Sequence, residues 1–249
     1  MIPVLLLMNN GLVKSKVFTD YKYIGDPLNA VKIFNDSHAD ELFFLDIKAT
    51  KENRLISPEL VRKIGEEAYM PFTVGGGIKN IADIRKLIHA GAERVMINTS
   101  AGMRPEFIRE AADAFGSSTI VVCMDVKKDF WKTEKIWLNN GSRSINYSPV
   151  EYARLIESKG AGEIIVQSIK RDGMMNGYDI DLIKEVAEAV KIPVVALGGA
   201  GKLKHLEEAF IKGHANGLAA ASMFIYQGKK QGVLINYPDL STINFSEWQ

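Results

Sequence analysis

Eight short apolar runs, each followed by a longer amphipathic segment, predict an α/β fold of the (β/α)8, or TIM-barrel, class. The apolar runs are continuous rather than alternating, which is typical of parallel strands that are covered on both faces. A chain of 249 residues also has the length that one such barrel needs. A doubly wound open sheet is the main alternative that this order of elements allows.

The predicted strands are rich in valine, isoleucine and leucine. They cover Ile2–Leu7, Leu42–Asp46, Pro71–Val74, Arg94–Asn98, Thr119–Asp125, Glu163–Gln167, Pro193–Leu197 and Gly217–Ala221. Helical periodicity is found in Pro58–Ile64, where Ser57 is a candidate N-cap, and in Ile81–Ile88. Further helices are predicted to begin near Pro27, Pro105, Pro149, Asp179 and Leu203.

The composition excludes several classes of protein. Lysine and arginine number 31 against 30 acidic residues, and the net charge of +1 argues against a general nucleic-acid or polybasic membrane binder. The apolar run Ile2–Met8 is too short to cross a bilayer, and Asn9-Asn10-Gly11 after it indicates a turn. We expect one domain over residues 1–249, with a divergent C-terminal tail from about residue 225.

Cysteine and histidine usage limits the chemistry further. Cys123 is the single cysteine, which excludes an internal disulfide and fits the reducing cytoplasm. We expect it to be a small core residue without the partner groups that a nucleophile needs. The four histidines are scattered, so we expect no metal site and no other cofactor.

One glycine-rich pattern occurs in both halves of the chain. Val74–Gly77 and Leu197–Gly201 each follow a short strand that proline opens. One unit later, a strand ends in a small polar pair, Asn98-Thr99 or Ala221-Ser222. This self-similarity predicts a barrel made of two duplicated half-barrels.

The glycine turns predict two phosphate sites at the barrel mouth, where the C-terminal ends of the strands place barrel active sites. Glycine lets backbone N–H groups approach an anion, and the following helix adds a favourable dipole. The alternative is a pair of tight connections without a ligand. The candidate phosphate-binding residues are Gly77, Asn98 and Thr99 in the first half and Gly199, Ala221 and Ser222 in the second.

Three acidic residues follow strands at the same mouth: Asp46, Asp125 and Asp172. Asp125 is the best candidate for a general acid or base because it directly ends an apolar strand, although a helix cap or a solvated loop acid is the alternative. Asp46 is a candidate substrate contact. Lys14, after the first strand, either grips a phosphate or is an ordinary surface lysine.

Eight motifs follow one another along nearly the whole chain, up to about Phe224. They are Gly25-Asp26-Pro27, Phe44-Leu45-Asp46-Ile47, Phe72–Ile78, Ile97-Asn98-Thr99, Phe115-Gly116-Ser117, Gly160–Ile164, Arg171-Asp172-Gly173 and Gly198–Lys202. Together they closely resemble the HisF family, the cyclase subunits of imidazole glycerol phosphate synthase. The resemblance implies a HisH-like glutaminase subunit at the barrel base and ammonia that travels through the barrel to the mouth.

In HisF, ammonia then helps to cleave a formimino ribonucleotide and to close an imidazole ring. The resemblance implies catalytic roles for Asp125 and Lys14 and adds Asp172 and Gly173 to the phosphate contacts. It breaks at the first of the two HisF aspartates, because Leu6 occupies that position and leucine cannot accept a proton. Three more substitutions gather at the mouth, at Gln167, Lys170 and Leu197.

The barrel base departs less from the family. HisF gates ammonia entry with a ring of charged side chains, and Glu41, Arg94 and Glu163 match three of its members. Because unpaired charges inside a barrel are costly, three retained charges suggest a retained gate, and a plain stabilising ion-pair network is the alternative.

One lost catalytic acid beside a kept ammonia route resembles a HisF-like subgroup of bacterial surface-polysaccharide clusters. The segment Leu5-Leu6-Leu7 and the tail Gly228–Asp239 resemble it too. This resemblance implies that the barrel supplies ammonia to a separate sugar amidotransferase, which makes acetamidino sugars. It also implies that a phosphorylated small molecule binds at the mouth. A genuine cyclase of histidine biosynthesis and a non-catalytic scaffold that activates the glutaminase remain the alternatives, so enzyme status stays open.

Overall fold

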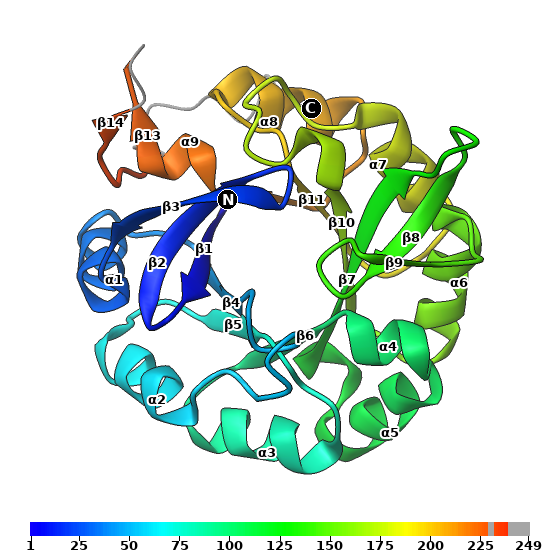
Figure 1. The fold of residues 1–249 in the computed structure, drawn as a ribbon, viewed down its shortest axis with the longest axis horizontal. Coiled ribbons are helices and arrows are strands. Elements are labelled where there is room, and N and C mark those ends of the chain that lie inside the picture. Colours follow the sequence, from blue (N-terminus) through cyan, green and yellow to red (C-terminus); the bar gives the residue numbers. More distant parts are fainter. Residues whose placement is uncertain (229–231, 239–249) are drawn as a thin grey trace.

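The computed structural model describes residues 1–228 and 232–238 of the chain. Eight parallel strands form a closed ring with helices around it (Figure 1), because the last strand pairs with the first, Ala219 opposite Ile2. The predicted (β/α)8 barrel is therefore confirmed, and the open sheet is wrong. In ring order the strands are β1 (Ile2–Met8), β4 (Leu42–Asp46), β5 (Phe72–Gly75), β6 (Arg94–Ile97), β7 (Ile120–Lys128), β10 (Glu163–Ser168), β11 (Val194–Leu197) and β12 (Gly217–Ala220).

The helices begin where the sequence supplies caps. Ser57 caps its helix as predicted, with Oγ accepting the Leu60 N–H at 3.3 Å, and Ser148 forms a capping box with Glu151. The helices are α1 (Pro27–Asp36), α2 (Pro58–Glu67), α3 (Ile81–His89), α4 (Thr99–Met103), α5 (Glu106–Phe115), α6 (Pro149–Ser158), α7 (Ile180–Ala187) and α8 (Leu203–Ile211).

Two hairpins at the mouth were not predicted. The first, β2 (Gly11–Lys16) with β3 (Thr19–Gly25), follows the predicted turn, where Asn9 and Asn10 have φ values of 52° and 64°. In the second, β7 continues beyond Asp125 and pairs with β8 (Glu134–Leu138), which pairs with β9 (Arg143–Ile145). Both hairpins lie over the ring in Figure 1.

The buried residues form an inner and an outer core, as the two-residue period of strands requires. Along β1, Ile2, Val4 and Leu6 belong to the cluster inside the barrel, whereas Leu5 and Leu7 pack in the layer between the sheet and the helices. The β1 position at which HisF has its first aspartate therefore faces the barrel interior.

The C-terminal tail completes the ring of helices around the barrel. Its described part contains no long helix. It begins with α9 (Ser222–Ile225) and a short pair, β13 (Tyr226–Gln227) with β14 (Gly232–Val233), and lies between α8 and α1 in Figure 1. Tyr237 then stacks on Phe224, with ring centroids 5.4 Å apart. Residues 229–231 and 239–249 of the predicted tail lie outside the described residues.

Candidate functional site

A cavity of about 360 Å³ opens at the mouth, on the carboxyl side of the barrel strands. Its apolar wall includes Leu6, Leu45, Met96 and Leu197, one from each of four strands. Of the predicted site residues, the cavity brings together Asp46, Gly77, Asn98, Thr99, Asp125, Asp172 and Ala221. Gly173, Gly199, Ser222 and Lys14 do not line it, although the Lys14 ammonium lies 3.4 Å from Oγ of Ser15, which does.

Asp125 is one of two buried carboxylates that line this cavity, with Asp172 as the other. Asp125 lies within β7 rather than at its end, opposite Gln167 of β10, because β7 continues into the second hairpin. Its side chain accepts a hydrogen bond from the Cys123 thiol at 3.6 Å, so the expectation that Cys123 lacks an acidic partner is wrong. Burial, with a smaller contribution from the charge of Asp172, raises the pKa of Asp125 to about 7. A carboxyl with that pKa can give or take a proton near neutral pH.

The position across the ring from Asp125 carries no acid. Leu6 lies on β1, which faces β7 across the eight-stranded ring, and it lines the same cavity. Its neighbours on either side, Leu45 and Ala221, are also apolar. Acid–base chemistry that needs two opposed carboxylates therefore lacks one of them here.

Lys14 forms a buried ion pair with Asp172. The Lys14 ammonium lies 3.2 Å from a carboxylate oxygen of Asp172, and both side chains are buried, so the alternative of an ordinary surface lysine is wrong. Ser15 Oγ donates to the other oxygen at 2.7 Å. Burial lowers the pKa of Lys14, and the pairing with Asp172 opposes that shift. Both predicted ligand contacts thus hold each other in this structure.

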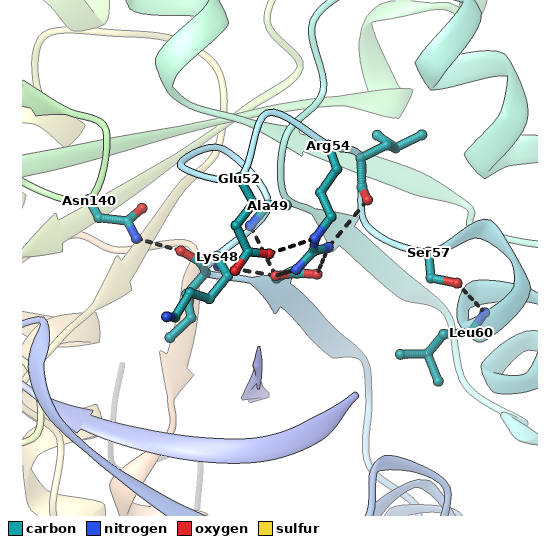
Figure 2. Close-up of polar contacts among 10 residues, drawn as sticks. Lys48, Ala49, Glu52, Arg54, Ser57, Leu60 and Asn140 are labelled. Atoms are coloured by element: carbon teal, nitrogen blue, oxygen red, sulfur yellow. Dashed lines mark hydrogen bonds and ion pairs between the residues drawn. The ribbon is translucent and has the colours of Figure 1, made fainter. Parts of the chain in front are cut away.

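Asp46 organises the loop after β4. Its carboxylate lies 2.5 Å from the Arg54 guanidinium and accepts the N–H groups of Lys48 and Ala49 at 3.0 and 3.1 Å. Arg54 also pairs with Glu52 at 2.8 Å, a contact that Figure 2 shows. In this structure, the carboxylate of the predicted substrate contact is therefore bonded to groups of its own loop.

The two glycine turns are packed alike against backbone. A Cβ atom on Gly77, where φ is +71°, would lie 1.8 Å from the Arg54 carbonyl oxygen. A Cβ atom on Gly199, where φ is +113°, would lie 2.1 Å from the Gly177 carbonyl oxygen. Both positions therefore need glycine because another backbone segment packs there, whereas we expected glycine for the approach of an anion, which stays a prediction.

The polar residues beside the two glycine turns differ in their hydrogen bonds within the chain. Asn98 lies just after β6 and donates to the Cys123 carbonyl at 3.0 Å, and Thr99 Oγ1 accepts the Asn139 N–H at 3.0 Å. Ser222, their counterpart in the second half, is buried and its Oγ has no hydrogen-bond partner among the described residues. Asn139 belongs to a turn between β8 and β9 that sequence reasoning missed, although Asn139-Asn140-Gly141 is a strong turn signal.

The three predicted gate residues meet at the base of the barrel. The Arg94 guanidinium contacts Glu41 and lies 3.1 Å from Glu163, and Thr73 Oγ1 donates to Glu41 at 2.9 Å. Burial raises the pKa of Glu163, and the charge of Arg94 opposes that shift. A second cavity, of about 270 Å³, opens here and is lined by Glu41, Glu163 and Ile2.

The two cavities approach each other inside the barrel. On β1, Ile2 lines the base cavity, whereas Val4 and Leu6 line the mouth cavity. The side chains between them are apolar and include Phe43, Val121 and Ile165. An apolar interior of this kind favours a small neutral molecule over an ion, because an unpaired charge there loses its hydration.

None of the helices among the described residues combines the length and the apolar run that a membrane crossing requires. The same described residues also contain no group of three or more histidine, cysteine, aspartate or glutamate side chains arranged to hold a metal ion.

Comparison with known proteins places this geometry among related chains. The family model described as "Histidine biosynthesis protein" matches residues 1–231. A protein of Pseudomonas aeruginosa strain PAO1, provisionally named imidazole glycerol phosphate synthase subunit hisF2, is 42% identical over 243 residues, covering 98% of this chain and 97% of that protein. The imidazole glycerol phosphate synthase subunit HisF of Clostridium botulinum strain Langeland is 44% identical over 230 residues, covering 91% and 90% of the two chains.

Proposed function

The chain belongs to the HisF family, and from that premise we propose that it is the ammonia-delivering synthase subunit of a glutamine amidotransferase complex. A HisH-like glutaminase binds at the base and releases ammonia there. The ammonia passes through the apolar interior to the mouth and is used there for sugar amidation by a separate amidotransferase, in the making of an acetamidino sugar of a surface polysaccharide.

Leu6 is the single observation that carries this proposal. It replaces the carboxylate that would face Asp125 across the mouth, and Leu45 and Leu197 in the same cavity are apolar as well. Asp125 can still move one proton, but the site lacks the acid opposite it that the cyclase reaction uses. The gate charges at the base, Glu41, Arg94 and Glu163, are by contrast present and in contact.

In this proposal Asp125 assists the passage of ammonia at the mouth. A carboxyl with a pKa of about 7 is partly neutral at physiological pH, so it can hydrogen-bond to neutral ammonia without fixing it as ammonium. The first glycine turn holds a phosphorylated ligand, and the Lys14–Asp172 pair supports the hairpin that covers the mouth.

A genuine cyclase of histidine biosynthesis is the second candidate, because relatives of this chain carry the name imidazole glycerol phosphate synthase subunit HisF. The test supplies the purified complex with ammonia and the formimino ribonucleotide. We expect no appreciable imidazole product from the natural chain, and a gain of product from Leu6→Asp. Product formation by the natural chain at the rate of a cyclase would overturn the proposal.

A scaffold that only activates the glutaminase is the third candidate. It differs in one measurable way, because a passive scaffold needs no open interior. Val4→Trp fills the barrel between the two cavities. We expect this variant to abolish glutamine-dependent amidation while amidation from added ammonium persists. Glutamine-dependent amidation that survives the blocked barrel would support the scaffold instead.

A further inference from the structure

The loops at the mouth are far more basic than the rest of the chain. They comprise residues 9–26, 47–57, 76–80, 98–105, 126–148, 169–179, 198–202 and 221–228, which follow the ring-forming parts of the strands. These loops hold 16 lysine and arginine residues against seven aspartate and glutamate residues, whereas the whole chain has an excess of one positive charge. The mouth face is therefore strongly basic, and the remainder of the chain is acidic on balance.

Exposed apolar side chains also gather at the mouth. Eight of the 15 large hydrophobic residues that are exposed among the described residues lie in these loops. They come from the first hairpin, the end of α4, the second hairpin and the loop after β10, and Tyr23, Met103 and Met174 are examples. In Figure 1 these segments lie on different sides of the ring opening. Exposed apolar side chains that gather in one region mark an interaction surface.

The most exposed of these side chains form the tip of the second hairpin, between β7 and β8. Phe130 is 91% and Trp131 is 80% exposed, and neither belongs to the buried core. Their rings contact each other edge to face, with centroids 5.4 Å apart. Aromatic side chains in such a position expose a large apolar area to water, and they are the residues that anchor protein interfaces.

The turn that carries the two aromatic residues is fixed by Asp129. Its carboxylate accepts the N–H groups of Trp131 and Thr133 at 2.9 and 3.0 Å, and its own N–H donates to the Thr133 carbonyl at 2.8 Å. Further down the hairpin, the Trp137 indole donates to the Lys127 carbonyl at 2.8 Å. Because the turn is ordered in the chain alone, a partner that binds the tip loses little conformational freedom there.

Lysine residues flank the aromatic pair. Lys132 directly follows Trp131 and has no ion pair within residues 1–228 and 232–238, whereas Lys128 lies 3.8 Å from Glu134. The tip thus presents an apolar pair with an ammonium group beside it. An apolar pocket within an acidic surface is complementary to this tip in both polarity and charge.

The proposed function identifies the protein that has to bind at the mouth. Ammonia that escapes into water is protonated near neutral pH, because ammonium, like the lysine side chain, gives up its proton only well above pH 7. Efficient transfer therefore requires the acceptor amidotransferase to cover the mouth. A nucleic acid or an anionic membrane also attracts lysines, but neither can take up the ammonia.

We propose that the mouth face is the docking surface of the acceptor amidotransferase, and that Phe130 and Trp131 anchor it by entering an apolar pocket within an acidic surface of that enzyme. This inference rests on the proposed function, and it adds the place of contact and the chemistry of the partner's surface. The glutaminase of the proposed complex binds at the opposite end of the barrel, so both proteins can be bound at once.

Surface plasmon resonance tests the anchor, with the purified amidotransferase as the probe and the chain in complex with its glutaminase as the immobilised sample. We expect the double variant Phe130→Ser, Trp131→Ser to bind about 30-fold more weakly than the natural chain. Ile211→Ser, at an exposed apolar residue that ends α8, is the matched control and should bind like the natural chain. Co-elution with the glutaminase shows that each variant is folded.

A charge reversal tests the acidic character of the partner's surface. We expect Lys132→Glu to weaken binding about tenfold at low salt and by less as salt is added, because exposed charges are screened. Lys63→Glu makes the same change on the exposed face of α2 and should have no such effect. A Lys132→Glu variant that binds no more weakly than Lys63→Glu would overturn the acidic surface.

Three further results would overturn the docking surface. They are a natural complex that does not bind the amidotransferase, a double variant that binds it as tightly as the natural chain, and a tip that binds vesicles of phosphatidylcholine and phosphatidylserine instead of the enzyme. Delivery of ¹⁵N from glutamine to the sugar, measured on the same preparation, separates the causes. Delivery without binding rejects the docking surface alone, whereas absence of delivery rejects the proposed function as well.

Discussion

The base and the mouth of this barrel both hold buried carboxylates, but the side chains that contact these carboxylates differ. At the base, Arg94 lies between Glu41 and Glu163 and offsets both charges. At the mouth, the nearest partner of Asp125 is the Cys123 thiol, while the buried cation Lys14 contacts Asp172 instead. The carboxylates at the base are thus stabilised in their charged form by an ion pair. Asp125 at the mouth has no such cation, and burial favours its neutral form.

The difference concerns how each end carries its charge. A paired network at the base can hold buried charges against the cost of burial. Asp125 lies among Leu6, Leu45 and Leu197 and has no carboxylate opposite it on β1. The paired base is what the proposed ammonia entry requires, whereas the mouth lacks the opposed pair of carboxylates that a cyclase would use.

Removal of the base cation is expected to have the largest effect on stability. Arg94→Met leaves Glu41 and Glu163 side by side without a cation, and we expect a loss of about 3 kcal/mol in the free energy of unfolding. Denaturant titration measures it. Arg104→Met is the control, since its ion pair with Glu110 is exposed and its removal should leave the denaturation midpoint unchanged. A loss at Arg94 no larger than at Arg104 would mean that the base charges are not coupled.

The mouth should respond to pH through Asp125. Burial raises the pKa of Asp125 from its usual 3.8 to about 7, so the folded state holds this proton more tightly than the unfolded state. Its contribution to stability is therefore fully present below about pH 4 and falls as the pH rises to 7. Asp125→Asn removes this dependence, and we expect its gain over the natural chain to be about 2–3 kcal/mol greater at pH 8 than at pH 5.

Chemical denaturation of both proteins at the two pH values provides the test. Asp113→Asn, on the exposed face of α5, is the matched control and should show no such trend. A gain at Asp125→Asn that is equal at pH 5 and pH 8 would show that the carboxyl is ionised throughout, and the contrast with the base would fail.

Loss of the Lys14 charge tests the contrast between the two carboxylates of the mouth, since Asp172 has a cation as its partner and Asp125 has none. Lys14→Met keeps the apolar stem but leaves Asp172 with Ser15 as its side-chain partner, and we expect a loss of about 2 kcal/mol. Lys16→Met, exposed at the end of the same strand, is the control. Thermal unfolding compares the two. Equal melting temperatures would indicate that Asp172 needs no cation.

The smallest effect is expected where the tail meets the base. Tyr237 donates to the Met1 carbonyl at 2.9 Å or to Asp40 at 2.8 Å, and Tyr237→Phe removes those bonds while it keeps the stacking on Phe224. We expect a loss of about 1 kcal/mol in the free energy of unfolding, with Tyr69→Phe at an exposed site as the control. A loss below the error of the measurement would show that the tail is held by packing alone.

The barrel was predictable because its signals are local. Continuous apolar runs, proline and serine at helix starts, and glycine at strand ends each act within a few residues, so the strands were placed to within about three residues. The second hairpin was missed because β7 continues past Asp125, and residues 134–137 of β8 pair with this extension. Which strand this segment pairs with depends on which strand edge is free in the folded barrel, and that is a property of the tertiary structure.

The common location of many candidate site residues was predictable, and their contacts were not. Asp125, Thr99 and Gly77 gather in one cavity because parallel strands end at the same mouth. Nothing local indicated that Lys14 would pair with Asp172 across 158 positions, or that Asn139 would donate to Thr99. Both contacts depend on hairpins that fold back over the mouth.

The most direct measurement follows one nitrogen atom through the barrel. The assembled complex receives glutamine labelled with ¹⁵N at its amide, together with unlabelled ammonium in the solution, and the amidated sugar is analysed by mass spectrometry. If ammonia passes from the Arg94 gate to the Leu6 mouth, the product carries ¹⁵N even when unlabelled ammonium is in excess. A product whose label follows the composition of the solution would contradict delivery through the barrel.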